Sequence, residues 1–192
     1  MRKLFLFIVC FILFGVGIKA QRFPQAVLPG DYPDPSILRD GKDYYMTHSP
    51  FYYAPGFLIW HSTDLMRWEP VCRALPEYEG SAMAPDLLKY QGRYYIYYPT
   101  STGENYVIYA DDIRGPWSRP VKLDVRGIDP GHVVGEDGKR YLFTNNGWIT
   151  PLSDDGLKVT GKSRKVYDGW KYPANWVTEG KDMYLESPKL LY

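Results

Sequence analysis

The chain has 192 residues, of which 23 are basic and 22 acidic, and its formal net charge is +1. This balance, without a run of Lys or Arg, argues against nucleic-acid binding and against attachment to an anionic membrane surface. Aromatic residues make up 17% of the chain, which excludes an intrinsically disordered segment.

The first 20 residues have the organisation of a secretory signal peptide. Arg2 and Lys3 precede an uncharged run over 4–18, and Ala20 supplies a small residue at the cleavage point. We expect export to the periplasm or the extracellular space, and a mature chain of 21–192 without membrane contact. An uncleaved signal anchor is the alternative, because the apolar run approaches the length of a membrane span.

Three stretches of the mature chain repeat one pattern: a turn that contains proline, a short apolar strand, a hairpin glycine and an aromatic strand. The turns are Asp34-Pro35, Ala84-Pro85 and Asp129-Pro130, and the hairpin glycines are Gly41, Gly92 and Gly138. These glycines are 51 and 46 residues apart. A repeat of this period, with turn signals between aromatic runs, is typical of stacked β-blades.

Each repeat has a second half, with two more predicted strands joined by an acidic turn. We therefore expect an all-β chain without helices, a β-propeller of four-stranded blades near 30–78, 79–125 and 126–175. A fourth turn opens at Glu186-Ser187-Pro188. Propellers typically have four to eight blades, whereas cleavage leaves 192 − 20 = 172 residues. Residues 21–192 are thus predicted to be a partial propeller, truncated after about three and a half blades. A β-sandwich is the alternative, but its strands need not recur as one unit.

Equivalent positions of successive blades converge on the propeller axis, so the repeated turns predict one shared pocket. The acidic residues of these turns are Asp34, Asp129 and Glu186. Glycoside hydrolysis needs two separated carboxyl groups, one to protonate the leaving oxygen and one to activate water or attack the sugar. A third carboxylate nearby helps to keep the acid protonated. The alternative for each single Asp-Pro pair is a plain turn starter.

The ordered set of turns resembles glycoside hydrolase family 43. It is carried by Tyr32-Pro33-Asp34-Pro35, Ala84-Pro85-Asp86, Ile128-Asp129-Pro130 and Glu186-Ser187-Pro188. The resemblance implies a five-bladed propeller and hydrolysis of xylosyl or arabinofuranosyl linkages in plant polysaccharides or oligosaccharides, with inversion at the anomeric carbon. It implies Asp34 as general base, Glu186 as general acid and Asp129 as the residue that keeps the acid protonated and orients it. Inversion would place base and acid about 6.5–9.5 Å apart.

The resemblance also implies a sugar-binding role for Phe51. Met83 stands where the family usually has a Trp before Ala-Pro, so the stacking platform is lost or moves to Tyr52 or Trp60. His132 follows Asp129 by three residues and is expected to border the pocket. Glu179 is the second candidate for the general acid.

No cofactor and no metal ligand set is predicted, and an axial metal ion in a complete propeller is left open. The fifth blade, which supplies basic and His residues in the family, is missing, so this chain is expected to be incomplete as an enzyme. Two other functions remain as alternatives: a retaining hydrolase of the fructan-cleaving propeller type, and a carbohydrate-binding propeller remnant without catalysis.

Overall fold

The computed structural model describes residues 26–188 except 79, 170 and 177–184. The expected signal peptide and Glu179 therefore lie outside the described residues. All twelve described strands belong to three antiparallel sheets of four strands each, and each sheet is built from consecutive strands of the chain. These sheets confirm the all-β prediction and the four-stranded blades.

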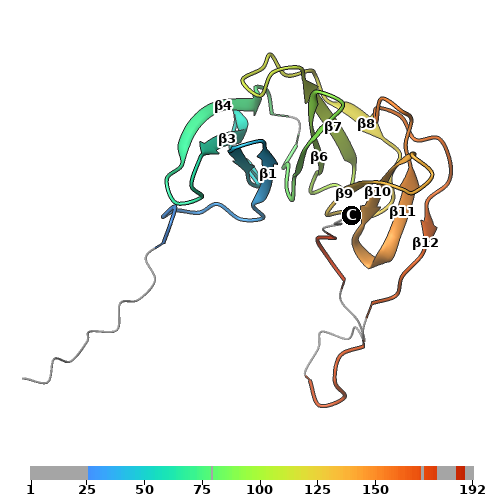
Figure 1. Cartoon of the computed structure of the whole chain (residues 1–192). Helices are drawn as coiled ribbons and strands as arrows, with labels where there is room; N and C mark the ends of the chain where they lie inside the picture. Colours follow the sequence, from blue (N-terminus) through green and yellow to red (C-terminus); the bar gives the residue numbers. More distant parts are fainter. Residues whose placement is uncertain (1–25, 79, 170, 177–184, 189–192) are drawn as a thin grey trace, which may run out of the picture.

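The three sheets fall within the three predicted blade ranges. The first contains β1 (Ser36–Asp40), β2 (Asp43–Thr47), β3 (Gly56–Ser62) and β4 (Glu69–Leu75). The second contains β5 (Asp86–Tyr90), β6 (Arg93–Pro99), β7 (Asn105–Ala110) and β8 (Val121–Leu123). The third contains β9 (Gly131–Val134), β10 (Arg140–Thr144), β11 (Trp148–Pro151) and β12 (Arg164–Lys165), with the 3₁₀ turn Asn145–Gly147 before β11. The sheets form an arc, with β4, β8 and β12 at its outer rim (Figure 1).

The hairpin between β5 and β6 shows why the repeat needs its glycine. Tyr90 pairs with Arg93, so the loop has only the two residues Gln91 and Gly92. Both have positive φ, 49° and 85°, as in the type I′ turns that match the twist of a hairpin. Gly accepts this conformation without steric cost.

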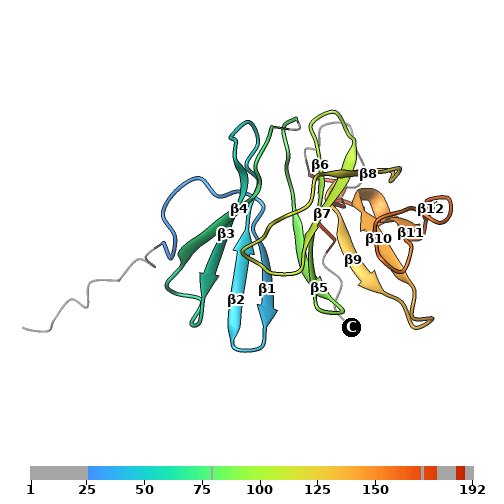
Figure 2. The same ribbon diagram turned by 90° about the horizontal axis from the view of Figure 1, so that it is seen from above.

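The first strands of the three sheets follow one another along the inner side of the arc (Figure 2). Two side chains at equivalent repeat positions link them. Ser36 Oγ in β1 accepts a hydrogen bond from the Leu87 amide of β5 at 3.0 Å, and Asp86 Oδ2 accepts one from the His132 amide of β9 at 2.7 Å. These links hold the ends of the inner strands together, where the repeated turns lie.

Strand β6 is buried on both faces because it belongs to the middle sheet. Side chains alternate along a strand, so Tyr94, Ile96 and Tyr98 pack toward the first sheet, while Tyr95 and Tyr97 pack toward the third. A strand covered on both faces has a continuous apolar run instead of alternating polar positions. This explains the uninterrupted aromatic sequence of the second repeat.

A buried arginine lies between the second and third sheets. Arg140 is only 1% exposed. Its Nε donates to His132 Nε2 at 2.9 Å, its Nη2 to the Tyr97 hydroxyl at 3.0 Å, and its guanidinium carbon lies 4.5 Å from the ring centres of Tyr90 and Tyr95. Burial, and next the charge of Arg140, lower the pKa of His132 to about 3. His132 is thus neutral and acts in the packing between blades.

Candidate active site

The repeated turns converge on one cavity of about 280 Å³. Its lining contains residues from all four turns: Asp34, Pro35, Ala84, Pro85, Asp129, Pro130 and Ser187. The sequence separation between Asp34 and Asp129 is therefore bridged by the blade arrangement, as the repeat predicts. Two carboxylates and one hydroxyl thus line a common space.

The residue before each turn proline has an unusual backbone conformation. The φ angles of Asp34, Ala84, Asp129 and Ser187 are 53°, 40°, 56° and 49°. Positive φ costs an L-residue of order 1–3 kcal/mol, and such strain tends to occur at functional sites. The recurrence of this conformation at four equivalent positions indicates that the turns place the side chains in the same way in each blade.

The fourth turn differs from the prediction in its register. Ser187, not Glu186, occupies the position equivalent to Asp34 and Asp129. Glu186 lies one residue earlier, is exposed and is not among the residues that line the cavity. Its role as general acid stays a prediction.

The fourth turn is held against the third blade. The amide and the hydroxyl of Ser187 donate to Asp129 Oδ2 at 3.2 and 3.4 Å, and the Leu185 carbonyl accepts a hydrogen bond from the Asn146 amide at 2.7 Å. Gly131 leaves room for this approach, because a Cβ there would lie 2.0 Å from the Pro188 carbonyl oxygen. Asp129 thus binds the residue that follows Glu186. Its orienting role stays a prediction.

Asp34 is held by a residue that the sequence reasoning missed. Ser49, which is 3% exposed, donates from its Oγ to Asp34 Oδ2 at 2.5 Å. Ser49 lies outside the repeated turn, so no signal in the sequence marks it. Ser187 was also missed, but aligning Ser187-Pro188 with the other residue–proline pairs would have found it.

Phe51 and Tyr52 do not line the cavity of the turns. Phe51 lines a second cavity of about 440 Å³ together with Tyr32, His48 and Trp60, and its amide donates to the Ala82 carbonyl at 2.9 Å. Tyr52 is 75% exposed, whereas Trp60 is 9% exposed. Of the two alternative stacking platforms, only Tyr52 therefore presents its ring to solvent.

Neither Met83 nor His132 lines the cavity of the turns. Met83 is half-buried directly before Ala84, and its amide donates to the Pro99 carbonyl at 3.0 Å. His132 does not line the cavity of the turns, because its ring packs in the Arg140 network described above. The structure brings together Asp34 and Asp129 in one cavity, whereas His132 does not border that cavity.

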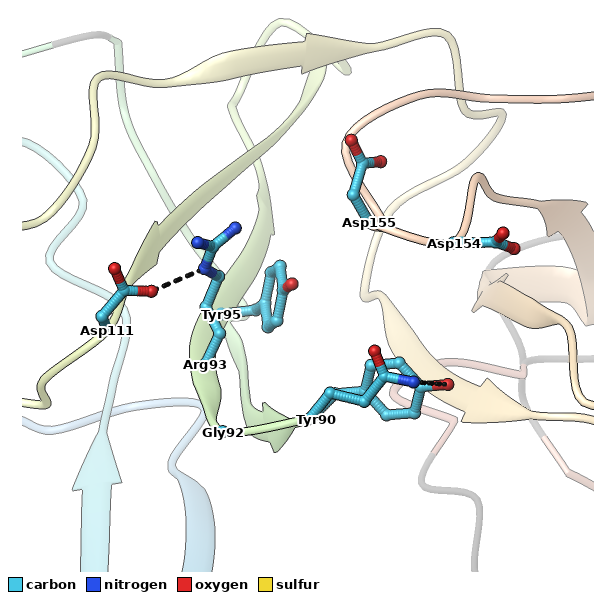
Figure 3. Close-up of a pocket in the computed structure, with 8 residues that line it drawn as sticks. Tyr90, Gly92, Arg93, Tyr95, Asp111, Asp154 and Asp155 are labelled. Carbon is cyan, nitrogen blue, oxygen red and sulfur yellow. Dashed lines mark hydrogen bonds and ion pairs between the residues drawn. The ribbon is translucent and has the colours of Figure 1, made fainter.

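A further pocket of about 430 Å³ opens beside the Arg140 network, between the second and third sheets (Figure 3). Arg93 and Asp111 form an ion pair at 2.8 Å on one side, and Asp154 and Asp155 lie on the loop opposite. None of these residues belongs to a repeated turn. We therefore assign the candidate active site to the cavity of the turns.

Comparison with known proteins identifies the family. The family model for glycosyl hydrolases family 43 matches residues 23–190. The chain belongs to glycosyl hydrolase family 43. It is 33% identical to a xylosidase/arabinosidase of Butyrivibrio fibrisolvens, over 82% of this chain and 35% of that protein. It is 32% identical to a β-xylosidase of Bacillus subtilis, over 78% of this chain and 34% of that protein.

Solved structures agree with this family 43 assignment. A xylan β-1,4-xylosidase from Bacillus halodurans superposes with a TM-score of 0.68 at 32% identity, over 78% of this chain and 34% of that one. A family 43 protein of Bacillus licheniformis gives 0.68 at 31% identity, over 77% and 34%. The chain thus spans about a third of the length of the curated relatives that it matches.

The described residues contain no helix that is long and apolar enough to cross a membrane. They also contain no group of three or more His, Cys, Asp or Glu side chains arranged to hold a metal ion.

Proposed function

We propose that this family 43 chain hydrolyses xylosyl or arabinofuranosyl linkages in plant polysaccharides or oligosaccharides. The observation that carries the proposal is the convergence of Asp34 and Asp129, 95 residues apart in sequence, on one cavity with the fourth turn. The substrate class follows the relatives, which include a non-reducing-end α-L-arabinofuranosidase of Bacteroides ovatus at 30% identity as well as xylosidases.

The proposed reaction is a single displacement. Asp34 accepts a proton from a water molecule as the water oxygen bonds to the anomeric carbon. Glu186 donates its proton to the glycosidic oxygen as the bond between that oxygen and the anomeric carbon breaks. The products are a free sugar of inverted configuration and the alcohol of the leaving group, with Asp34 protonated and Glu186 ionised. Proton exchange with solvent then restores both groups.

Asp129 supports this reaction through the backbone. Its Oδ2 accepts hydrogen bonds from Ser187, the residue after Glu186. A residue that fixes the backbone next to the acid also limits the directions in which the acid's side chain can point. The rate of an enzyme depends strongly on such exact placement of its catalytic groups. We also propose that the chain is exported, on the pattern of its first 20 residues.

The proposal is tested by comparing the full-length gene product with its Asp34→Ala variant on aryl β-xylosides, aryl α-arabinofuranosides and xylo- and arabino-oligosaccharides. We expect the unsubstituted full-length product to hydrolyse at least one of these substrates, and Asp34→Ala to lose about 10²–10⁴-fold in kcat on each of them, which is the range of general base catalysis. The matched control is Asp43→Ala, which removes a carboxylate of the first sheet that binds His61 at 2.8 Å outside the cavity. Equal rates for wild type and Asp34→Ala would contradict the proposal, as would complete absence of turnover.

A further inference from the structure

We propose that Ser49 is a positioning residue, which fixes the carboxylate of Asp34 to the turn of the second blade. The inference rests on the proposed function, because it gives Ser49 its role through the general base. The argument depends on the two hydrogen bonds of one hydroxyl group and on the way the backbone around that hydroxyl is held.

The Ser49 hydroxyl joins two of the converging turns. Its proton is donated to Asp34 Oδ2 at 2.5 Å, and its oxygen accepts the Ala84 amide at 2.6 Å. A hydroxyl has one proton to donate, so acceptance from Ala84 and donation to Asp34 together fix its direction. Within the described part of the chain, Ser49 is the hydrogen-bond partner of the Asp34 carboxylate. The second oxygen, Oδ1, is left for the attacking water.

The backbone of Ser49 is itself fixed, so the hydroxyl cannot follow a moving carboxylate. Its amide donates to the Pro33 carbonyl at 2.9 Å, and its carbonyl lies 3.2 Å from His48 Nδ1. Ser49 and His48 are 3% and 8% exposed, and Pro50 follows directly. The hydrogen bond from the Ser49 amide goes to Pro33, the residue before Asp34. Ser49 therefore holds the base through its backbone and through its side chain.

The second blade has Ala84 where the first and third blades have Asp. The structure assigns a use to this difference, because the Ala84 amide, and not a side chain, supports the base through Ser49. Ala84 also lines the cavity and, like the two aspartates, has a positive φ. The turn without a carboxylate thus serves as the anchor for the carboxylate of its neighbour.

A matched control lies two residues after Asp34. Ser36 is 4% exposed, and its Oγ also joins the first blade to the second, by accepting the Leu87 amide at 3.0 Å. Ser36→Ala therefore removes one buried hydroxyl and one link between blades, as Ser49→Ala does, but it does not remove the contact with Asp34. Ser49→Thr keeps the hydroxyl and is the conservative variant.

The experiment measures kcat and KM of the full-length gene product and its variants Ser49→Ala, Ser49→Thr and Ser36→Ala on the best aryl glycoside, and hydrogen exchange of the Ala84 amide by NMR. We expect Ser49→Ala to lower kcat about 10²-fold, the effect of a misplaced reacting group, with KM changed by less than about threefold. Ser49→Thr should recover most of this rate, and Ser36→Ala should stay close to wild type. The Ala84 amide should exchange faster in Ser49→Ala only.

Equal kcat in Ser49→Ala and Ser36→Ala would overturn the positioning role, and so would a loss in Ser49→Ala that appears in KM alone. A full-length gene product without turnover would overturn the proposed function instead. The link from Ser49 to the second blade would then be tested by hydrogen exchange of the Ala84 amide alone. An exchange rate that is unchanged in Ser49→Ala would overturn the proposal. If Ser49→Ala does not fold, Ser49→Thr decides, since slow kcat in a folded Ser49→Thr with a protected Ala84 amide would contradict the role of the hydroxyl.

Discussion

Substitution of Gly131 by alanine should separate the fourth turn from the cavity. An added Cβ would lie 2.0 Å from the Pro188 carbonyl oxygen, whereas real Cβ atoms essentially never approach closer than 3.0 Å. The chain near Pro188 must therefore move by at least 3.0 − 2.0 = 1.0 Å. This movement would break the long hydrogen bonds between Ser187 and Asp129.

A displacement of this size affects both catalysis and folding. Misplacement of a catalytic group by about 1 Å can cost about 10²-fold in rate, which corresponds to about 2.7 kcal/mol of transition-state stabilisation. Gly131 has no positive φ, so alanine is compatible with its backbone, and the lower entropy of the unfolded chain offsets part of any strain by about 0.4–1 kcal/mol. We expect a lower midpoint of urea unfolding, because the atom that must move belongs to the backbone of Pro188 and not to a flexible side chain; activity is therefore compared under conditions in which both variants are folded.

The assay compares kcat/KM of wild type and Gly131→Ala on an activated aryl glycoside and on an unactivated oligosaccharide. The loss should be larger on the oligosaccharide, because its leaving group depends on the proton of Glu186. Gly161→Ala is the control, since its Cβ would meet only a ring carbon of Pro151, Cγ, at 3.0 Å, and neither residue lines the cavity. Wild-type activity of Gly131→Ala on both substrates would refute the reasoning that the fourth turn works from this position.

Further predictions concern the two proposed catalytic groups and the buried network. Glu186→Ala should lower kcat on oligosaccharides about 10²–10⁴-fold and spare activated aryl glycosides; equal losses on both would make Glu179 the next candidate for the acid. Arg140→Ala should lower the free energy of unfolding by about 2–5 kcal/mol in urea titrations, because it leaves a cavity and unpaired partners, and wild-type stability would show that the network is dispensable. The pKa of His132 is about 3 in the folded chain and about 6.5 when unfolded, so the unfolded state binds the extra proton between these values. The contribution of neutral His132 to the free energy of unfolding should therefore be fully present above pH about 6.5. It should fall by up to about 1.4 kcal/mol per pH unit toward pH 3. If His132→Asn shows the same dependence of unfolding free energy on pH, this prediction is contradicted.

The fold could be predicted because its signals are local and repeated. Each blade contains a proline turn and a hairpin glycine at fixed spacing, and positions such as Gly92 need a backbone conformation that glycine accepts without steric cost. A propeller converts equal sequence positions into neighbouring spatial positions. The meeting of Asp34 and Asp129 in one cavity follows from that rule.

The remaining features depend on contacts between elements that the repeat does not mark. Ser49 reaches Asp34 and Ala84 from a loop outside the repeated turns. Arg140 is a cation that a sequence pattern would place at the surface, yet tyrosine rings from the second blade enclose it. The register of the fourth turn is ambiguous in the sequence because the acidic residue, Glu186, does not directly precede the proline, Pro188, as Asp34 and Asp129 precede theirs.

The stereochemistry of the product tests the central claim most directly. The configuration at the anomeric carbon can be followed by ¹H NMR in the first minutes of hydrolysis, before mutarotation mixes the anomers. A single displacement with Asp34 as base predicts that the first sugar released has the configuration opposite to that of the substrate. Release of the sugar with retained configuration would contradict the account, because it would require a covalent intermediate on one of the carboxylates.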